Sequence, residues 1–505
     1  MPDVIIVGGG LGGLVCAARL ATGGKKVVVL EKKPQVGGTS TIFRRGDYAF
    51  PMGPLSFSFP GRVREFLAEA GVEQELACRP SRFALSAPFG TVEYSRPLRD
   101  LRKDLKRVFP EEALGLDIFA TELGKAMVVV SDLDRWHPDY QPGAGRDDAY
   151  KKMRTAELNR YRLVSQYGTT PAAAILDRLF SDVRLKAFLG SMGTERPSMS
   201  WLNLAHMWNV MSSEGIWFPE GGVHWLADRL CEVILARGGE VRCPEPVRKV
   251  LVRDGRAVGV ATARGQALEA RWIVSNADYK TLFLELLDPG DVPPEHLKLV
   301  RNTPYTGSEL CVYLGLDAGR ADLSRLGVEH TFFRRQQTGT RASDLEDFDE
   351  REVEVCHWSA QAPESAPPGR AALVLRMGFP YDHFSRWRTG ERTRLDGYKE
   401  YKTQLARKLV ATVEPLIPGL SRAVDMMEVA TPLTYRDWGN RHLGSIAGWT
   451  WTPEAAVALR SKLLVETPVP GLLAAGAYAA TELFLGGVPT AMFTGRLAAE
   501  VILES

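Results

Sequence analysis

A glycine-rich turn near the start of the chain constrains its fold more than any other feature. Residues 4–7 (VIIV) form a short β-branched run that is typical of a buried parallel strand. The turn that follows, residues 8–13 (GGGLGG), fits the spacing G-x-G-x-x-G, and residues 14–22 carry a helical pattern. A second predicted strand, residues 27–30, ends at Glu31. Strand, turn, helix, strand and acid in this order predict a βαβ unit that binds a dinucleotide.

The residues of this turn have separate physical roles. Gly8 permits a tight turn, Gly10 lets the backbone approach a pyrophosphate, and Gly13 lets the helix pack closely on the sheet. The helix N-terminus, at Leu11 and Gly12, offers free N–H groups to an anion. All of these residues are therefore candidates for binding a cofactor.

The acid after the second strand and a later glycine pair narrow the identity of the dinucleotide. The Glu31 carboxylate can accept both ribose hydroxyls and would repel a 2′-phosphate, which favours FAD or NAD over NADP. Lys32 follows it, and a second glycine turn, Gly37-Gly38-Thr39, comes shortly after. A flavin dinucleotide is the longer ligand, and its far phosphate and ribityl chain need a second close approach of the backbone. The sequence therefore predicts FAD.

This combination of motifs resembles the FAD signature of the flavoprotein superfamily of amine oxidases and phytoene desaturases. Many members carry Arg directly after the Gly-Gly pair, where this chain has Thr39. Residues 50–54 (FPMGP) resemble the F-D-x-G-P segment of phytoene desaturases and carotenoid isomerases, which lies beneath the flavin. Pro51 replaces the usual Asp there, so only Gly53 and Pro54 carry over as candidates.

The middle of the chain resembles the superfamily's segment that returns to the nucleotide. Residues 219–278 run in the order P-x-G-G, helix, G-G, strand, valine, a hairpin turning at residues 254–255, and V-S-N-A-D. In members of the superfamily the valine pairs its backbone with the adenine, and the N-A-D loop caps the nucleotide end. The resemblance makes Val247, Asn276 and Ala277 candidates here.

The C-terminal part resembles the segments that hold the flavin ring. A buried strand pattern ends at Gly476-Ala477, and a turn Gly487-Val488-Pro489 starts a helix of small residues. A helix N-terminus suits the negative charge of a reduced flavin. In the superfamily the Gly-Val-Pro backbone lies at the pyrimidine edge, which makes these residues candidates.

The resemblance implies an α/β fold with two domains. A Rossmann-like FAD-binding domain of the glutathione-reductase type is expected from residues 1–90, 216–290 and 427–505. An inserted α+β substrate domain is expected from residues 91–215 and 291–426.

The resemblance also implies the kind of reaction, and the branch that fits best includes phytoene desaturases, carotenoid isomerases and retinol saturases. It implies hydride transfer between flavin N5 and an apolar, isoprenoid or carotenoid-like polyene, or flavin-assisted isomerisation of a double bond. The choice between desaturation, saturation and isomerisation stays open. Only one G-x-G-x-x-G occurs, so electrons are expected to pass to dioxygen or a quinone. Candidates for a catalytic role are Glu482, Tyr478, Arg436, Asp437 and Trp449.

Two other functions stay open at this point. A flavin amine oxidase would need an aromatic cage, which Trp449 with Trp451 or Tyr478 could supply. A non-catalytic prenyl-lipid binder, similar to the GDP-dissociation inhibitors, would not need the intact glycines and Glu31. No cysteine follows Cys356, so the C-terminal thioether to flavin of some amine oxidases cannot form, and non-covalent FAD is expected.

Composition and charge exclude several classes of partner. Lys and Arg number 63 against 61 Asp and Glu, a balance that gives no reason to expect a nucleic acid. Six scattered cysteines without a CxxC pair predict no metal site and fit a reducing compartment. No signal peptide or long apolar stretch is evident, so a cytoplasmic protein is expected. The basic residues 96–107 fit an ion-paired, solvated helix better than a helix in peripheral contact with a membrane.

Overall fold

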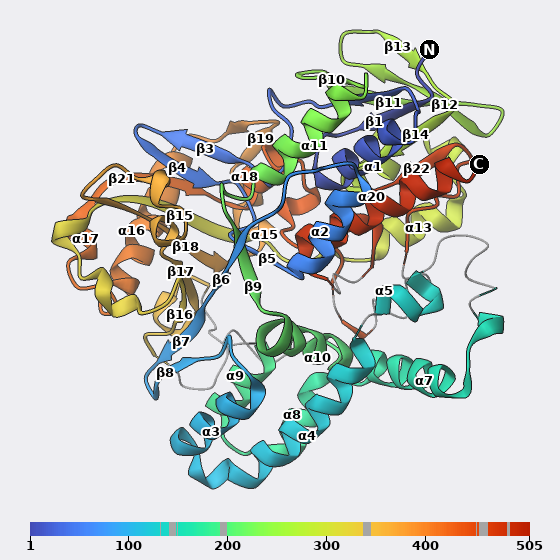
Figure 1. Cartoon of the computed structure of the whole chain (residues 1–505). Helices are drawn as coiled ribbons and strands as arrows, with labels where there is room; N and C mark the ends of the chain where they lie inside the picture. The colour runs from blue at the N-terminus through green and yellow to red at the C-terminus, as the bar shows by residue number, and fades with distance from the viewer. Residues whose placement is uncertain are drawn as a thin grey trace.

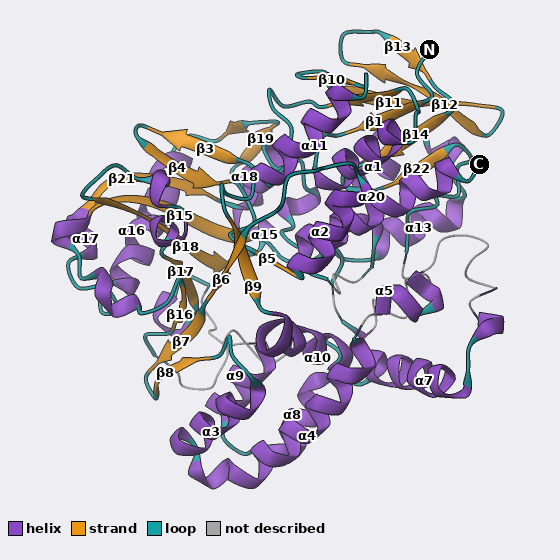
Figure 2. Ribbon diagram, viewed as in Figure 1, coloured by secondary structure: helices purple, strands orange, loops and turns teal. Residues whose placement is uncertain are grey.

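The computed structural model describes most of the chain in three parts (Figures 1 and 2). The first is built on a parallel sheet, the second on a larger mixed sheet, and the third is a lobe of helices. Both chain termini lie beside the parallel sheet (Figure 1). The described residues are 1–131, 133–140, 148, 150–191, 199–336, 345–450, 452–453, 463–481 and 485–505.

The parallel sheet has five strands in the order β10-β2-β1-β14-β22. Its strands are β1 (Val4–Val7), β2 (Val27–Leu30), β10 (Glu240–Arg242), β14 (Trp272–Ser275) and β22 (Leu472–Ala474). Every neighbouring pair is parallel, and the residues of β1, β2 and β22 are buried throughout, as their apolar runs predict. The last residues of four strands pair across the sheet: Val7 with Leu30 and Ser275, and Ser275 with Ala474. The loops that follow these strands therefore share one edge.

Three long helices pack on the parallel sheet (Figure 1). They are α1 (Leu11–Thr22), α11 (Trp225–Ala236) and α20 (Gly487–Leu503). Helices α1 and α20 touch closely, because a Cβ atom on Gly495 would lie 2.1 Å from the backbone O of Gly12. This contact brings the C-terminal helix to the start of the chain.

An antiparallel sheet of three strands lies beside the parallel one. It consists of β11 (Val247–Arg253), β12 (Arg256–Thr262) and β13 (Ala267–Glu269). The first hairpin turns at Asp254 (φ 50°) and Gly255 (φ 73°), and positive φ at both central residues is what a tight two-residue hairpin turn requires.

The larger sheet has seven strands in the order β21-β15-β18-β17-β16-β7-β8. They are β21 (Val424–Ala430), β15 (Glu309–Asp317), β18 (Arg370–Gly378), β17 (Val353–Cys356), β16 (His330–Phe333), β7 (Phe83–Ala87) and β8 (Gly90–Glu93). One face packs on α16 (Tyr398–Val413) and α17 (Leu420–Ala423) through alternate side chains such as Leu310, Leu373 and Val355. The opposite face faces the interior of the molecule.

The helical lobe lies below both sheets in Figure 1. It contains α3 (Leu98–Val108), α4 (Ala113–Val130), α7 (Thr155–Thr169), α8 (Ala172–Leu179), α9 (Val183–Ser191) and α10 (Trp201–Asn209), with α5 (Leu133–Trp136) beside it. Trp201 and Trp208 fill its core. On α3, the predicted basic helix, Lys106 pairs with Asp117 (2.6 Å) and Arg107 with Asp104 (3.0 Å), as in a solvated, ion-paired face.

Shorter elements connect the three parts. They are β3 (Ile42–Arg45), β4 (Tyr48–Pro51), β5 (Phe57–Ser58), β6 (Cys78–Ser81), β9 (Ile216–Pro219), β19 (Arg388–Gly390), β20 (Thr393–Arg394), α2 (Pro60–Glu69), α12 (Tyr279–Thr281), α13 (Pro294–Asn302), α14 (Trp358–Gln361), α15 (Tyr381–Ser385) and α18 (Pro432–Asp437). Within the described ranges, no helix combines the length and apolar character needed to cross a membrane.

The sheet topology moves two of the expected domain boundaries. Strands β7 and β8 join the seven-stranded sheet, because β7 pairs in parallel with β16 through Phe83 and His330. The expected boundary at residue 90 therefore falls inside this sheet. Strand β21 pairs with β15, so the boundary expected at residue 427 cuts through a strand of the same sheet. Pairing partners distant in the chain decide both positions.

Candidate functional site

The first glycine turn leaves two buried donors open at the start of α1. Gly13 N donates to Oδ1 of Asn276 (3.0 Å), whereas the N–H groups of Leu11 and Gly12 find no acceptor among the described residues. Both residues are buried, and the N-terminus of a helix favours negative charge. A buried N–H without a partner costs free energy, so these two donors fit an anionic ligand such as a pyrophosphate.

Three distant segments meet at this turn. A Cβ atom on Gly12 would lie 2.5 Å from the backbone N of Gly476, and one on Gly10 would lie 2.6 Å from Nδ2 of Asn276. At Gly8 the positive φ of 98° is the constraint, since a Cβ atom there would be in ordinary contact with Asn276 C (3.5 Å) and Ala277 N (3.7 Å). The glycines are therefore required by the close packing of the loops that follow β1, β14 and β22.

Glu31 lies at the same edge with acceptor capacity to spare. Its side chain is buried, and its two carboxylate oxygens accept from Gly9 N (2.7 Å) and Lys33 N (2.8 Å). A carboxylate has about four acceptor positions, so about two remain for hydroxyl groups. Glu245 N donates to the backbone O of Glu31 (2.7 Å), which places the start of β11, at Val247, near this acid. Lys32 is exposed at the rim.

The second glycine turn packs directly on the first. Gly37 N donates to Gly9 O (2.7 Å), and a Cβ atom on Gly38 would lie 3.2 Å from the Cα of Gly10. On its other side, a Cβ atom on Gly53 would come within 2.8 Å of the Thr39 Cβ, and Pro54 follows Gly53 in the chain. The motifs at residues 8–13, 37–39 and 53–54 therefore form one continuous surface.

The start of α20 offers a second set of open donors. Gly486 caps the helix with a positive φ of 83°, and Gly487, Val488 and Pro489 form its first turn. No acceptor among the described residues takes the N–H groups of Gly487 and Val488. The segment Gly476-Ala477 is tied to α20 by two hydrogen bonds of 2.9 Å. Gly476 N donates to Oγ1 of Thr494, and this hydroxyl donates to the backbone O of Gly476.

Sequence reasoning missed Arg441, which reaches into this site from a distant loop. Its Nη2 donates to Oγ1 of Thr39 (3.1 Å), and its Nη1 donates to the backbone O of Ile446 (2.6 Å) and lies 3.5 Å from the Tyr478 hydroxyl. The arginine that many relatives carry after the glycine pair is absent here, yet a guanidinium stands beside that position. Residues 444–448 (GSIAG), just after Arg441, carry two glycines, but this pattern does not indicate which residue Arg441 contacts.

Asp278, also missed, holds the loop that carries Arg441. The Asp278 carboxylate accepts from the backbone N of His442 (3.0 Å) and from the Tyr305 hydroxyl (3.1 Å). Burial raises the pKa of Asp278, although these hydrogen bonds oppose the shift. The acid that follows Asn276-Ala277 thus fixes the Arg441 loop against the nucleotide-binding half.

Tyr478 and Trp449 pack against each other. The Trp449 indole N–H donates to the backbone O of Tyr478 (3.0 Å), and both rings lie 4.7 Å from the ring of Tyr305. Trp449 is 1% exposed and packs in the core, and a catalytic or cage role for it stays a prediction. The Tyr478 hydroxyl lies 3.3 Å from the O and Oγ of Ser445, and burial raises its pKa. Trp451 lies outside the described residues.

The charged catalytic candidates do not converge on the site. Asp437 is buried between Arg388 (2.9 Å) and Arg394 (2.7 Å), which hold the pKa of its carboxyl below the usual range although burial opposes the shift. Arg436 pairs with Glu285 (3.2 Å) on the surface side of α18. Both side chains are engaged in ion pairs, and a catalytic role for either of them stays a prediction. Glu482 lies outside the described residues, and the described residues contain no group of His, Cys, Asp and Glu that could hold a metal.

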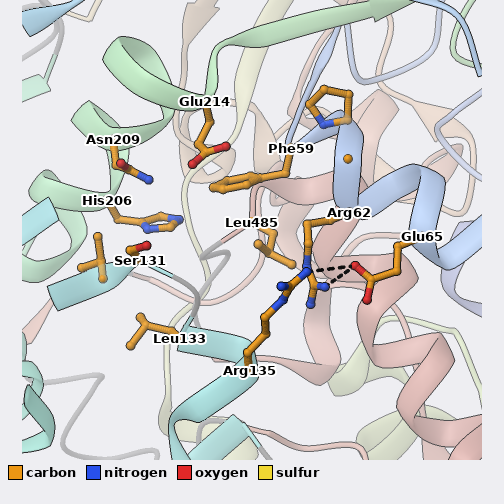
Figure 3. A pocket seen from close by; sticks show the side chains of 13 residues that line it. Phe59, Arg62, Glu65, Ser131, Leu133, Arg135, His206, Asn209, Glu214 and Leu485 are labelled. Atoms are coloured by element: carbon orange, nitrogen blue, oxygen red, sulfur yellow. Dashed lines mark hydrogen bonds and ion pairs between the residues drawn. The ribbon is translucent and has the colours of Figure 1, made fainter. Parts of the chain in front are cut away.

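A pocket of about 400 Å³ opens where the helical lobe meets α2 (Figure 3). The rings of Phe59 and His206 stack across it, with centroids 6.1 Å apart. Arg62 and Arg135 both pair with Glu65 on the opposite side. Leu485 also lines it and directly precedes the turn that starts α20. The pocket therefore borders the residue that precedes the turn predicted to hold the flavin ring.

One protein-family model matches nearly the whole chain. The model described as flavin containing amine oxidoreductase matches residues 11–503. Among solved structures, cyclohexylamine oxidase from Brevibacterium oxydans IH-35A superimposes with a TM-score of 0.62 at 16% identity, covering 100% of this chain and 99% of that one. This similarity confirms the predicted fold class, a Rossmann-like domain with an inserted substrate domain.

Curated relatives align at similar length. All-trans-retinol 13,14-reductase from Danio rerio is 24% identical over 99% of this chain and 86% of its own. Prolycopene isomerase from Daucus carota is 26% identical over 99% of this chain and 81% of its own. A neurosporene-forming phytoene desaturase from Rhodobacter capsulatus is 24% identical over 100% of this chain and 94% of its own.

Proposed function

Because this chain belongs to the flavin containing amine oxidoreductase family, we propose that it binds FAD non-covalently and acts on an apolar isoprenoid or carotenoid-like polyene. One observation carries the proposal. The two glycine turns pack on each other beside Glu31, next to the N–H groups of Leu11 and Gly12, which have no acceptor among the described residues. The three curated relatives are named for all-trans-retinol, prolycopene and phytoene, which are isoprenoid molecules. The family makes the protein a flavin-dependent oxidoreductase.

The geometry supports a proposal for the residues that would hold FAD. The N–H groups of Leu11 and Gly12 suit the pyrophosphate, and the free acceptor positions of Glu31 suit the ribose hydroxyls. We propose that further residues also border the cofactor. They are Gly8, Gly10, Gly13, Lys32, Gly37, Gly38, Thr39, Gly53, Pro54, Val247, Asn276, Ala277, Gly476, Ala477, Gly487, Val488 and Pro489.

The flavin, when bound, supplies hydride transfer to or from a carbon of the substrate. The chain's own residues bind and orient. Arg441 holds Thr39 beside the second glycine turn, and Tyr478 keeps its proton through burial while it bonds to Ser445. Within the described part of the chain neither Asp437 nor Arg436 is free to move a proton, which fits a reaction whose main requirement is a dry, oriented site.

Two further parts of the proposal concern the surroundings of the enzyme. With a single G-x-G-x-x-G in the sequence, the proposed electron acceptor is dioxygen or a quinone. Peripheral contact with a membrane is proposed at the helical lobe, where α4 exposes Leu114 (73%) and Val128 (69%) next to the basic α3. An apolar substrate would be delivered from such a surface.

The function is tested with the purified full-length protein. Flavin absorbance near 450 nm, retained or acquired after FAD is added, is expected and would disappear on anaerobic reduction. Phytoene, prolycopene and all-trans-retinol are then supplied in micelles with oxygen or a quinone, and products are separated by chromatography. Conversion of at least one polyene supports the proposal. Absence of flavin binding, or peroxide formation with cyclohexylamine in place of polyene conversion, would overturn it.

A further inference from the structure

A row of charged side chains crosses the interior face of the seven-stranded sheet. Four adjacent strands contribute one residue each: Glu309 from β15, Arg376 from β18, Glu354 from β17 and His330 from β16. Each of these residues alternates along its strand with the apolar side chains that pack on α16 and α17. The row therefore lies on the face turned away from those helices.

The four side chains are joined into one chain of contacts. Arg376 donates from Nη2 to Oε2 of Glu309 (2.9 Å) and from Nε to both of its oxygens (3.1 Å). Arg376 Nη1 lies 3.3 Å from Oε2 of Glu354, whose Oε1 lies 3.0 Å from Nδ1 of His330. His330 also stacks on Phe83 of the next strand, with centroids 4.2 Å apart. The contacts fix the orientation of the row.

One end of the row adjoins the predicted cofactor segments. Ile446, the residue whose carbonyl accepts from Arg441, donates its own N–H to Gly307 O (3.1 Å), two positions before Glu309. The Tyr435 hydroxyl donates to Glu309 from the same side. The charged row thus begins next to the loop that holds Arg441 at Thr39 and extends from there across the sheet.

The middle of the row is accessible from this face. Arg376 lies on an interior strand, so neighbouring strands cover it on both sides, yet its side chain is 23% exposed and that of Glu354 is 15% exposed. Since α16 and α17 cover the other face, the accessible area belongs to the interior face. A molecule that reaches this exposed area meets Arg376 and Glu354.

The charge of the row determines which chemical group suits it. Arg376 pairs with the carboxylates of both Glu309 and Glu354, and Glu354 also bonds to His330, so the positive charge of the row is already compensated. An additional anion would have no uncompensated positive charge to meet. Arg376 has five N–H groups. Nε and Nη2 serve Glu309 and Nη1 faces Glu354, which leaves one N–H on each of Nη1 and Nη2 for a neutral oxygen.

We propose that this row is a recognition site for a hydroxyl or carbonyl oxygen on the substrate, with Arg376 as the donor. The inference rests on the proposed function and names its substrate class more narrowly: an isoprenoid chain that carries a neutral oxygen group. A pure hydrocarbon laid over the row would remove water from Arg376 and return no hydrogen bond, which is unfavourable.

The test compares two ligands that differ only in the oxygen. All-trans-retinol and its deoxy hydrocarbon are titrated into the purified flavoprotein, and binding is followed by quenching of tryptophan fluorescence. Retinol is expected to bind about tenfold more tightly, the effect of one hydrogen bond to a charged group. Arg376→Met should bring the ratio of the two dissociation constants near one, and the hydrocarbon should bind at least as tightly as it does to the unmodified protein.

Controls separate this proposal from the proposed function. Arg370→Met changes the other arginine of β18, which pairs with Asp425 on the exposed side (2.6 Å), and should keep the tenfold ratio. Equal affinity of the two ligands for the unmodified protein would overturn the inference without any variant, as would an unchanged ratio in Arg376→Met. Flavin absorbance reports on the proposed function independently, because ligand binding is measured without turnover.

Discussion

Arg441 and Thr39 are 402 positions apart in the chain, and the Arg441 guanidinium donates to the Thr39 hydroxyl over 3.1 Å. Thr39 ends the second glycine turn, which packs on the first. A positive charge is therefore present beside the turn although the turn itself carries none. Proximity of a guanidinium to a site for a phosphate-bearing ligand favours binding of that ligand.

Replacement of Arg441 should weaken FAD binding. In Arg441→Gln the charge and the hydrogen bond to Thr39 are removed, and the dissociation constant for FAD is expected to rise about tenfold, or about 1.4 kcal/mol. The measurement is titration of flavin-free protein with FAD, followed by flavin fluorescence. The control variant Arg320→Gln removes a guanidinium just after β15, where Arg320 pairs with Asp317. This variant should bind FAD as the unmodified protein does. Equal affinities of the two variants would contradict the role of Arg441.

Glu31 provides an independent test of the nucleotide end. Glu31→Ala removes the acceptors proposed for the ribose hydroxyls and is expected to raise the FAD dissociation constant by tenfold or more. Because Glu31 also accepts from Gly9 and Lys33, Glu31→Gln serves as the comparison that keeps the side-chain volume. The exposed Glu269, paired with Arg253, gives a control alanine variant. Unchanged affinity in Glu31→Ala would mean that the adenosine end lies elsewhere.

The parallel sheet was predictable from local sequence because each of its signals is short-range. The β-branched residues of β1 and β2, the glycines between β1 and α1, and Glu31 at the end of β2 lie within one unbroken stretch, and each has a direct structural cause. Asn276 and Gly476 were reached through motifs at the ends of β14 and β22. Their meeting with Gly12 follows from the parallel register of those strands.

The features that sequence reasoning missed depend on contacts between distant segments. Nothing in the residues around Thr39 or around Arg441 indicates that the two side chains meet. The charged row also depends on distant contacts. A single Glu or Arg on an otherwise apolar strand does not indicate a site until the order of the strands in the sheet is known. Strand β15 lies next to β18 and not next to β16, so Glu309 could not be recognised from the sequence as a neighbour of Arg376.

We expect Asp437 to contribute to the free energy of unfolding and to have no role in the reaction. Its carboxylate lies between two guanidiniums and is 2% exposed, so Asp437→Asn leaves Arg388 and Arg394 without their anion and should cost about 3 kcal/mol of unfolding free energy. The pKa of the Asp437 carboxyl is lower in the folded protein than in the unfolded chain. The ion pairs therefore stabilise the fold above the unfolded-state pKa, and this stabilisation is lost as the pH falls through the folded-state pKa. Thermal unfolding at pH 7 and at pH 3.5 measures both effects. A full-stability variant that has lost polyene conversion would instead make Asp437 catalytic.

Glu352 should give the protein a distinct dependence of stability on pH. Burial raises the pKa of Glu352 to about 8, although Arg334 lies 3.5 Å away and opposes the shift. No described group donates a hydrogen bond to either carboxylate oxygen. A folded-state pKa above the unfolded value means that stability is full below the unfolded pKa, near 4.3, and falls as pH rises toward 8.

Glu352→Gln isolates this effect because the amide resembles the protonated acid and cannot ionise. The two proteins should unfold at similar temperatures below about pH 4, where Glu352 is neutral in both the folded and the unfolded state. From there to pH 8 the unmodified protein should lose about 1.4 kcal/mol per pH unit relative to the variant, and the gap should then level off. Thermal unfolding of both proteins across this range measures the gap. A gap that stays constant with pH would show that Glu352 is ionised in the fold and that Arg334 outweighs the cost of burial.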